Sequence, residues 1–321
     1  MYLYHFGLQR LPFGLTPDTA YFCELPGHRA ALNVLHVALA SGEGFIKITG
    51  EVGTGKTLLC RKLLADLDAQ SLSSQQASAQ HAHCAYIPNP VLTPQELRIA
   101  LAHELGMQLD PSEPDMLLAR RLELKLLKIA QLGRPVILII DEAQALPDDS
   151  LETLRLLSNL ETERHKLLQI VLFGQPELNH RLHSERFRQL RQRIAFSYHL
   201  PHLSPKQMTA YLSHRLHLSG RSGALPFSDA ALFVIAVCSR GIPRLGHVLA
   251  HKALIAAFGK GLACAGWREA FAAVRDTEDV RHSFSVPQQW FSTPHKWLLV
   301  GGLSALAIGA TAAVLIGEKF L

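Results

Sequence analysis

A glycine-rich octapeptide that ends in a lysine and a threonine is the strongest chemical signal in the sequence. It matches GxxxxGK[ST], follows a short apolar run and opens a helix-forming stretch. Glycines at this spacing let backbone N–H groups close around phosphate oxygens, and the start of the following helix adds positive potential. We expect Lys56 to reach the β- and γ-phosphates and Thr57 to ligate Mg²⁺. The residues expected to bind the nucleotide are Gly50, Glu51, Val52, Gly53, Thr54, Gly55, Lys56, Thr57 and Leu58.

An acidic pair, Asp141 and Glu142, follows five apolar residues at 136–140. Such a run predicts a buried strand, and in a parallel sheet ligands bind at the carboxyl ends of the strands. We expect Asp141 to hold Mg²⁺, directly or through water, and Glu142 to polarise the attacking water as general base. A charge pair at a helix start is the alternative, and the phosphate-binding loop earlier in the chain argues against it.

Gln175 follows another apolar run, at 168–174. A polar side chain at the end of that strand can position the attacking water beside the γ-phosphate. A turn residue in front of Pro176 is the equally open alternative.

Two arginine-bearing segments can complete the site. Residues 181–193 carry five arginines against one acid and lead into the last predicted strand. We expect Arg193, or else Arg191, to reach the γ-phosphate of a neighbouring subunit as an arginine finger; a solvated basic helix and a DNA-contacting patch are the alternatives. Arg244 lies at the start of a predicted helix, directly after Pro243, and can fold over the phosphates. A surface arginine is its alternative.

Apolar runs separated by helical patterns predict the elements that hold these groups. Continuous apolar strands alternating with helices are typical of a parallel sheet covered on both faces. From 201 to 276 only helical patterns occur, with Ser204 and Ser228 as expected N-caps. The predicted fold class is therefore α/β, a P-loop parallel-sheet domain followed by an all-helical lid. The predicted strands are residues 44–49, 83–88, 135–141, 168–174 and 194–200.

A charge-free run near the C-terminus predicts one membrane-spanning helix. Residues 298–316 contain no charged side chain, and at 1.5 Å per residue they span roughly 28 Å. His295 and Lys296 make the upstream flank the more basic one, which favours a cytoplasmic N-terminal part. A buried core helix is the alternative. The expected organisation is an N-terminal segment packing on the core (1–43), an α/β nucleotide-binding domain (44–200), a helical lid (201–276), a linker (277–296) and a transmembrane helix (297–317).

Composition excludes several classes of protein. The 321 residues are 48% hydrophobic and 18% charged, unlike a disordered chain, a collagen or a coiled-coil rod. A net charge of +5 permits nucleic acid or anionic lipid as a partner but requires neither. The five cysteines are scattered without a CxxC pair, which excludes a disulfide scaffold and a zinc ribbon.

The motifs and their order resemble those of AAA+ ATPases. The phosphate loop, DEAQ at 141–144, a polar residue after the fourth strand, an arginine before the fifth and GIPR in a helical lid occur in that family's order. Together with FGLQRLPFGLTPD, LLSNLETE, VLFGQPEL, LRQRI and GIPRLGHVLAHKAL, they resemble the ExeA/GspA-like secretion ATPases over roughly residues 1–275. Within that family the sequence is most similar to the MshM-type ATPases linked to biogenesis of the mannose-sensitive haemagglutinin (MSHA) type IV pilus.

This resemblance implies an ATPase that uses ATP and Mg²⁺ and forms a homo-oligomer, with the arginine finger supplied in trans. It makes Gln175 a sensor-1-like residue and Arg244 a sensor-2-like residue. The expected role is assembly of a type IV pilus or type II-like secretion machine, with assembly proteins as partners. The expected location is the bacterial inner membrane, single pass, with the ATPase domain in the cytoplasm. Nucleic acid is not an expected partner. A DNA-associated AAA+ regulator of the transposition type is the alternative, and the apolar C-terminal run argues against it.

Overall fold

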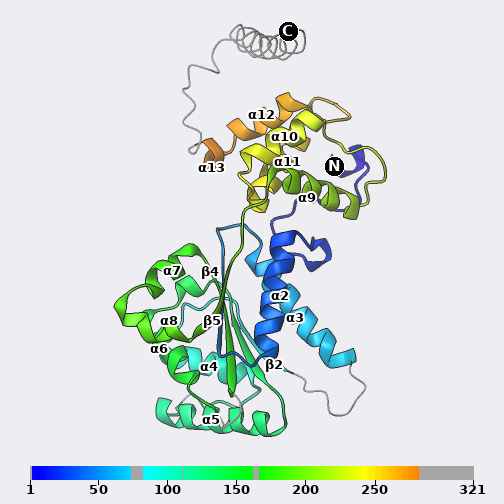
Figure 1. The fold of residues 1–321 in the computed structure, drawn as a ribbon. Helices are drawn as coiled ribbons and strands as arrows, with labels where there is room; N and C mark the ends of the chain where they lie inside the picture. Colours follow the sequence, from blue (N-terminus) through cyan, green and yellow to red (C-terminus); the bar gives the residue numbers. More distant parts are fainter. Residues whose placement is uncertain (1, 74–81, 111, 162–165, 282–321) are drawn as a thin grey trace, which may run out of the picture. The chain divides into compact units, whose positions relative to one another are not determined.

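A five-stranded parallel sheet forms the α/β part of the protein (Figure 1). The computed structural model describes residues 2–73, 82–110, 112–161 and 166–281. The strand order is β2-β3-β4-β1-β5, and every neighbouring pair is parallel. The predicted parallel α/β sheet is confirmed, with each strand end within one residue of its expected position. The strands are β1 (Phe45–Thr49), β2 (His83–Ile87), β3 (Val136–Ile140), β4 (Leu168–Gly174) and β5 (Ile194–His199).

Helices cover both faces of this sheet. One face packs against α2 (Pro26–Ala40) and α3 (Lys56–Ser73). The opposite face packs against α4 (Pro94–Glu104), α5 (Asp115–Gln131), α6 (Asp148–Leu157), α7 (Pro176–Leu182) and α8 (Arg188–Arg193). Successive residues of a strand point to opposite faces, so a strand covered on both sides is apolar throughout. In β3, residues 136, 138 and 140 join the second core, whereas 137 and 139 join the first.

The register of the sheet brings the predicted site residues to one edge. Thr49 of β1 pairs with Gly174 of β4, and Ile140 of β3 pairs with Leu172. The residues that follow β1, β3 and β4 therefore leave the sheet side by side at its carboxyl edge. This is the edge at which ligands of parallel sheets bind.

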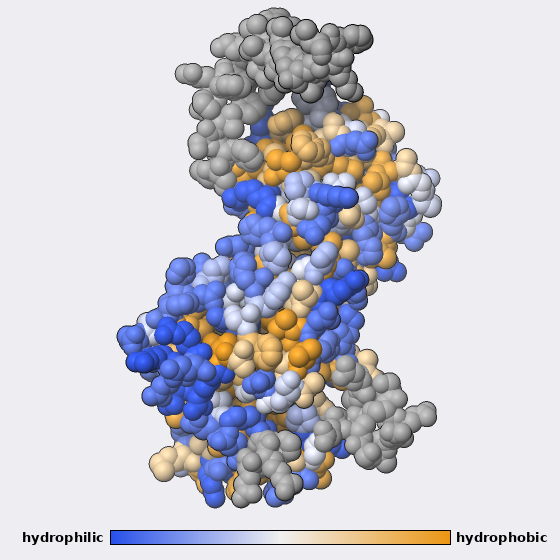
Figure 2. Space-filling model, viewed as in Figure 1, coloured by the Kyte–Doolittle hydropathy of each residue, from blue (hydrophilic) through white to orange (hydrophobic). Residues whose placement is uncertain are grey.

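The segment after β5 is helical, as predicted. It contains α9 (Pro205–Leu218), α10 (Asp229–Cys238), α11 (Pro243–Gly259) and α12 (Trp267–Arg275). Ser204 caps α9 in a reciprocal pair with Gln207, and Ser228 caps α10 by accepting from the Ala231 N–H. Both expected N-caps are confirmed. Large apolar side chains remain exposed on these helices, including Phe233 and Trp267, and hydrophobic residues are plentiful over the lid in Figure 2.

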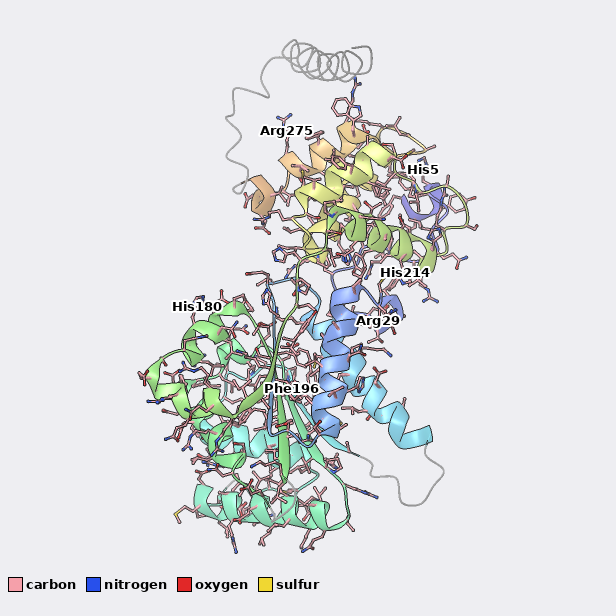
Figure 3. The ribbon with its side chains drawn as sticks, in the orientation of Figure 1. His5, Arg29, His180, Phe196, His214 and Arg275 are labelled. Atoms are coloured by element: carbon pink, nitrogen blue, oxygen red, sulfur yellow. The ribbon has the colours of Figure 1, made fainter. Side chains whose placement is uncertain are left out.

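The N-terminal segment contacts both the sheet and the helices after β5. In α1 (Tyr2–His5), the Tyr2 hydroxyl lies 2.9 Å from Nδ1 of His251. Nε2 of His5, which Figure 3 labels, lies 2.9 Å from the carbonyl oxygen of Leu262. Phe6 and Phe13 are buried. Within the segment 1–43, which is expected to pack on the core, α2 packs on the sheet, whereas the residues of α1 contact the lid. The physical reason is apolar burial, because a lid of few helices cannot enclose its own core.

The chain divides into two compact units, Met1–Val274 and Arg275–Leu321. Of the second unit, the structure describes residues 275–281, with α13 at Glu278–Arg281. Most of the predicted linker and the whole predicted transmembrane helix at 297–317 lie outside the described residues. Among the residues that are described, no helix is both long enough and apolar enough to cross a bilayer.

Candidate nucleotide site

The phosphate loop connects β1 to α3 through a turn that only glycines adopt without strain. Gly53 has φ +81° and Gly55 has φ +99°. A Cβ atom at Gly55 would lie 2.9 Å from Nε2 of His28, so space as well as backbone angle requires glycine there. Helix α3 begins at Lys56, directly behind the turn. The loop and the helix start therefore have the arrangement that binds phosphate.

The side chain of Lys56 folds back onto the phosphate loop. Its Nζ donates to the carbonyl oxygens of Gly50 at 2.8 Å and Glu51 at 3.0 Å. The side chain is buried, and this burial lowers the pKa of Lys56. Nearby carboxylates oppose the shift, and Glu142 has the largest effect among them. Among the described residues its hydrogen-bond partners are loop carbonyls alone, so the ammonium group is available for a phosphate.

Asp141 is a buried carboxylate at the end of β3. Its backbone N–H donates to the Ile87 carbonyl, and its Oδ1 accepts from the N–H of Glu142 at 2.9 Å. Burial raises its pKa, while a hydrogen bond from the Thr57 hydroxyl opposes that shift. The Thr57 hydroxyl and the Asp141 carboxylate both supply oxygens, the hard ligands that Mg²⁺ prefers.

Glu142 lies in the left-handed backbone region, with φ +51°. A non-glycine residue at such an angle costs about 1–2 kcal/mol and is kept only where its surroundings fix it. Its carboxylate Oε2 accepts from two amides, the side-chain Nε2 of Gln144 and the Nε2 of Gln175 at 2.9 Å. The structure therefore brings the predicted residues Glu142 and Gln175 together.

Gln144 is a member of this cluster that the sequence did not single out. Its Oε1 accepts from the backbone N–H of Gln175 at 3.0 Å, so it connects the ends of β3 and β4. The residue is part of the DEAQ motif, but its partner is 31 positions away in sequence. Only the pairing of β3 with β4 brings the two glutamines together.

His28 of α2 is a second residue that sequence reasoning missed. It is buried, and its Nε2 lies 3.1 Å from the Thr54 carbonyl oxygen within the phosphate loop. Burial lowers the pKa of this imidazole, which favours the neutral form that donates from Nε2. Its Nδ1 is buried and has no hydrogen-bond partner among the residues that the structure describes. The N-terminal helix thereby supports the loop from behind.

The start of α11 closes the other side of the loop. The backbone N–H of Arg244 donates to the Gly53 carbonyl at 3.2 Å. A pocket opens here, and Arg244 lines it together with Lys56, Thr57 and Glu142. The lid residue Arg244 therefore lies beside the phosphate loop.

Residues 14–18 and three lid side chains form the far wall of the same pocket. Tyr211 and His247 stack at a centroid distance of 5.5 Å, and the Tyr211 hydroxyl lies 2.9 Å from His247 Nε2. Burial, followed by the effect of Arg215, lowers the pKa of His247 to about 3. Arg215 is itself buried over the Tyr21 ring and donates from Nε to the Pro12 carbonyl at 2.6 Å.

Arg191 and Arg193 lie outside this pocket. Arg193 precedes β5, whose first residue pairs with Phe45 at the amino end of β1. It is separated from the phosphate loop by the length of a strand, about 17 Å. Its guanidinium donates to the Arg155 carbonyl and the Ser158 hydroxyl, and Arg191 donates to the carbonyls of Leu182 and His183. Neither arginine lines the pocket of its own chain. The surface over α7 and α8 is mostly hydrophilic in Figure 2.

Two sequence comparisons agree with this geometry. Residues 38–182 match the model of the AAA domain. The chain is 40% identical over 261 residues, 81% of its length, to general secretion pathway protein A of Aeromonas hydrophila. The match covers 46% of that relative, so the chain spans about half the length of the curated protein that it resembles.

Solved structures share the fold at low sequence identity. The Aeropyrum pernix ORC1 protein in complex with DNA has a TM-score of 0.62 at 18% identity, over 83% of this chain and 69% of that one. The Aeropyrum pernix ORC2 protein in its ADPNP-ADP complexes has a TM-score of 0.59 at 16% identity, over 82% and 72%. The Thermotoga maritima RuvB branch migration motor has a TM-score of 0.53 at 16% identity, over 83% and 73%. The chain therefore shares the fold of these structures, with a parallel sheet followed by helices, and its residues 38–182 match an AAA domain.

The residues present fit a nucleotide with a divalent cation. The glycine cradle has no room for side chains, and Lys56, which donates to loop carbonyls, lies beside it. The buried Asp141 carboxylate has a raised pKa, and a bound cation would stabilise its charged form.

Proposed function

We propose that this chain is a Mg²⁺-dependent ATP-hydrolysing AAA+ protein of the GspA type. It supports assembly of a type IV pilus or a type II-like secretion machine at the bacterial inner membrane. The observation that carries the proposal is the convergence of Lys56, Thr57, Glu142 and Arg244 on one pocket. The 40% identity to general secretion pathway protein A supports the assignment to secretion.

Four residues around the phosphate loop have roles in this proposal. ATP supplies the reactive γ-phosphoryl group, and Mg²⁺ neutralises its charge. The ammonium of Lys56 exchanges the loop carbonyls for β- and γ-phosphate oxygens. Thr57 and Asp141 would hold the cation through their oxygens. Arg244 contacts the phosphates from the lid, so the angle between lid and sheet responds to the nucleotide.

Glu142 is the general base of the proposed reaction. Its Oε2 is held by Gln144 and Gln175, which leaves Oε1 to accept a proton from the attacking water. Gln175 is then positioned to sense the γ-phosphate, because its amide belongs to the same cluster.

A second copy of the chain completes the site. Arg193, with Arg191 as the alternative, lies too far from the phosphate loop of its own chain to act there. We therefore assign it to the site of a neighbouring subunit, so that turnover depends on assembly.

The proposal includes a membrane anchor at residues 297–317. It rests on the charge-free run 298–316, with the ATPase domain on the cytoplasmic side. The machine served is, in this proposal, an MSHA-type pilus or a related secretion apparatus. Other assembly proteins are its expected partners.

Two variants test the chemistry. Lys56→Ala should abolish nucleotide binding, and Glu142→Gln should bind ATP but hydrolyse it poorly. Lys62→Ala, which alters a lysine of the same helix that pairs with Asp66, serves as the matched control. Normal ATP affinity in Lys56→Ala would refute the phosphate-site assignment, and unchanged turnover in Glu142→Gln would remove Glu142 as base.

One capture experiment tests the process. Full-length Glu142→Gln protein is purified from detergent-solubilised membranes in the presence of ATP, and its partners are identified. Pilus or secretion-platform proteins support the proposal. Recovery of DNA and a recombinase, or no membrane association, favours the transposition-type regulator instead.

A further inference from the structure

We propose that Gln144 is a positioning residue that holds the Glu142 carboxylate for catalysis. The inference rests on the ATP hydrolysis proposed above. It starts from the two opposite contacts of one amide group. Nε2 of Gln144 donates to Oε2 of Glu142, while Oε1 of Gln144 accepts from the backbone N–H of Gln175 at 3.0 Å.

These two contacts fix the orientation of the Gln144 amide. A backbone N–H can only donate, so the atom that faces Gln175 N must be the oxygen. The NH₂ group then necessarily faces Glu142, where a carboxylate oxygen accepts. Gln144 therefore links the backbone at the end of β4 to the Glu142 carboxylate at the end of β3 through two hydrogen bonds.

The Glu142 carboxylate is held asymmetrically. The amides of Gln144 and Gln175 both donate to Oε2, and in the described part of the chain no hydrogen bond ends on Oε1. Two donors on one oxygen fix the plane and rotation of the carboxylate, which a general base needs because its free oxygen must point at the water. The left-handed backbone of Glu142, φ +51°, is held within the same short turn.

The backbone around Gln144 is anchored independently of its side chain. Arg181 of α7 donates to the Gln144 carbonyl at 2.7 Å and also pairs with Asp148 at the start of α6. A Cβ atom at Gly174 would lie 3.5 Å from Oε1 of Gln144. Loss of the Gln144 amide should therefore leave the turn in place, while the Glu142 carboxylate loses one of its two donors and keeps the other, Gln175 Nε2.

The test is Gln144→Met, which keeps the length of the side chain and removes both amide contacts. We expect kcat for ATP to fall about tenfold or more, the effect of one charge-assisted hydrogen bond, while the Kd for ATP and the Tm stay near wild type. Gln131→Met, at an exposed glutamine of α5, is the matched control and should leave kcat unchanged. Gln144→Glu keeps the acceptor for Gln175 N–H but loses the donor to Glu142, and should show the same loss of kcat.

A double-mutant cycle decides whether Gln144 acts through Glu142. In the Glu142→Gln background, Gln144→Met should cause little further loss, because the carboxylate it positions is gone. An equal loss in both backgrounds, an unchanged kcat, or a loss confined to ATP affinity would overturn the proposal. A wild-type protein that binds ATP without hydrolysing it would instead overturn the proposed function itself, and with it the role of Gln144.

Discussion

The backbone N–H of Arg244 donates to the carbonyl of Gly53 at 3.2 Å, so the first turn of α11 rests directly on the phosphate loop. A Cβ atom at Gly53 would lie 2.6 Å from the Cβ of Arg244. The lid can approach this closely only because residue 53 is glycine. Any shift of the loop on binding phosphate is therefore felt at the start of the lid helix, and the reverse also holds.

Gly53→Ala should separate the lid from the phosphate loop. The substitution forces alanine into φ +81° and into contact with Arg244, so we expect ATP affinity to fall by about tenfold or more, together with about 1 kcal/mol of stability. Gly42→Ala is the matched control, because Gly42 also has a positive φ, +74°, but nothing lies within 4 Å of its Cβ position. It should lose stability alone. Calorimetric titration with ATP and thermal unfolding measure the two effects, and equal ATP affinities would contradict the proposed coupling.

His28→Leu should weaken nucleotide binding without removing any group that touches phosphate. The change deletes the donor to the Thr54 carbonyl, and we expect the Kd for ATP to rise about tenfold because the loop loses its support. His28→Gln carries an amide nitrogen at a similar reach and should restore most of the affinity. His36→Leu on the same helix, whose ring faces Asp66, is the control. Equal affinities in the leucine and glutamine variants would show that bulk, not the hydrogen bond, supports the loop.

A mixing experiment tests the arginine finger in trans. Arg193→Ala keeps a complete phosphate site but donates no finger, whereas Glu142→Gln keeps the finger and lacks the base. Each protein alone should turn over slowly, and a mixture should recover part of the activity because some interfaces combine the intact halves. Arg191→Ala is tested in parallel. If only Arg191→Ala complements Glu142→Gln, Arg191 is the finger, and if neither does, both assignments are wrong.

Acid should destabilise the protein through His247. Its pKa is about 3 in the folded protein, against about 6.5 in an unfolded chain. A lowered folded pKa gives stability that is fully present above about pH 6.5 and is lost as the pH falls toward 3, by about 1.4 kcal/mol per pH unit. Urea unfolding between pH 7.5 and 5 should show a shallower loss for His247→Gln than for wild type. Parallel pH curves for the two proteins would contradict the assignment.

The sequence by itself determined the fold class and the chemistry at the carboxyl edge of the sheet. Local rules suffice there, because buried strands are continuous apolar runs and a phosphate loop needs glycine at fixed positions. Lys56, Thr57, Asp141 and Glu142 are close in sequence to the strands that carry them. The parallel register then leaves them little freedom in space.

Only the tertiary structure decided which distant residues join that site. Gln144 and Gln175 meet because β3 pairs with β4, and His28 reaches the phosphate loop because α2 packs on the sheet beside α3. The division of the N-terminal segment between lid and sheet likewise depends on which apolar surface each part can bury. Such contacts join residues far apart in the chain, so no local periodicity predicts them. Their free energy comes from packing between helices and strands that are distant in sequence.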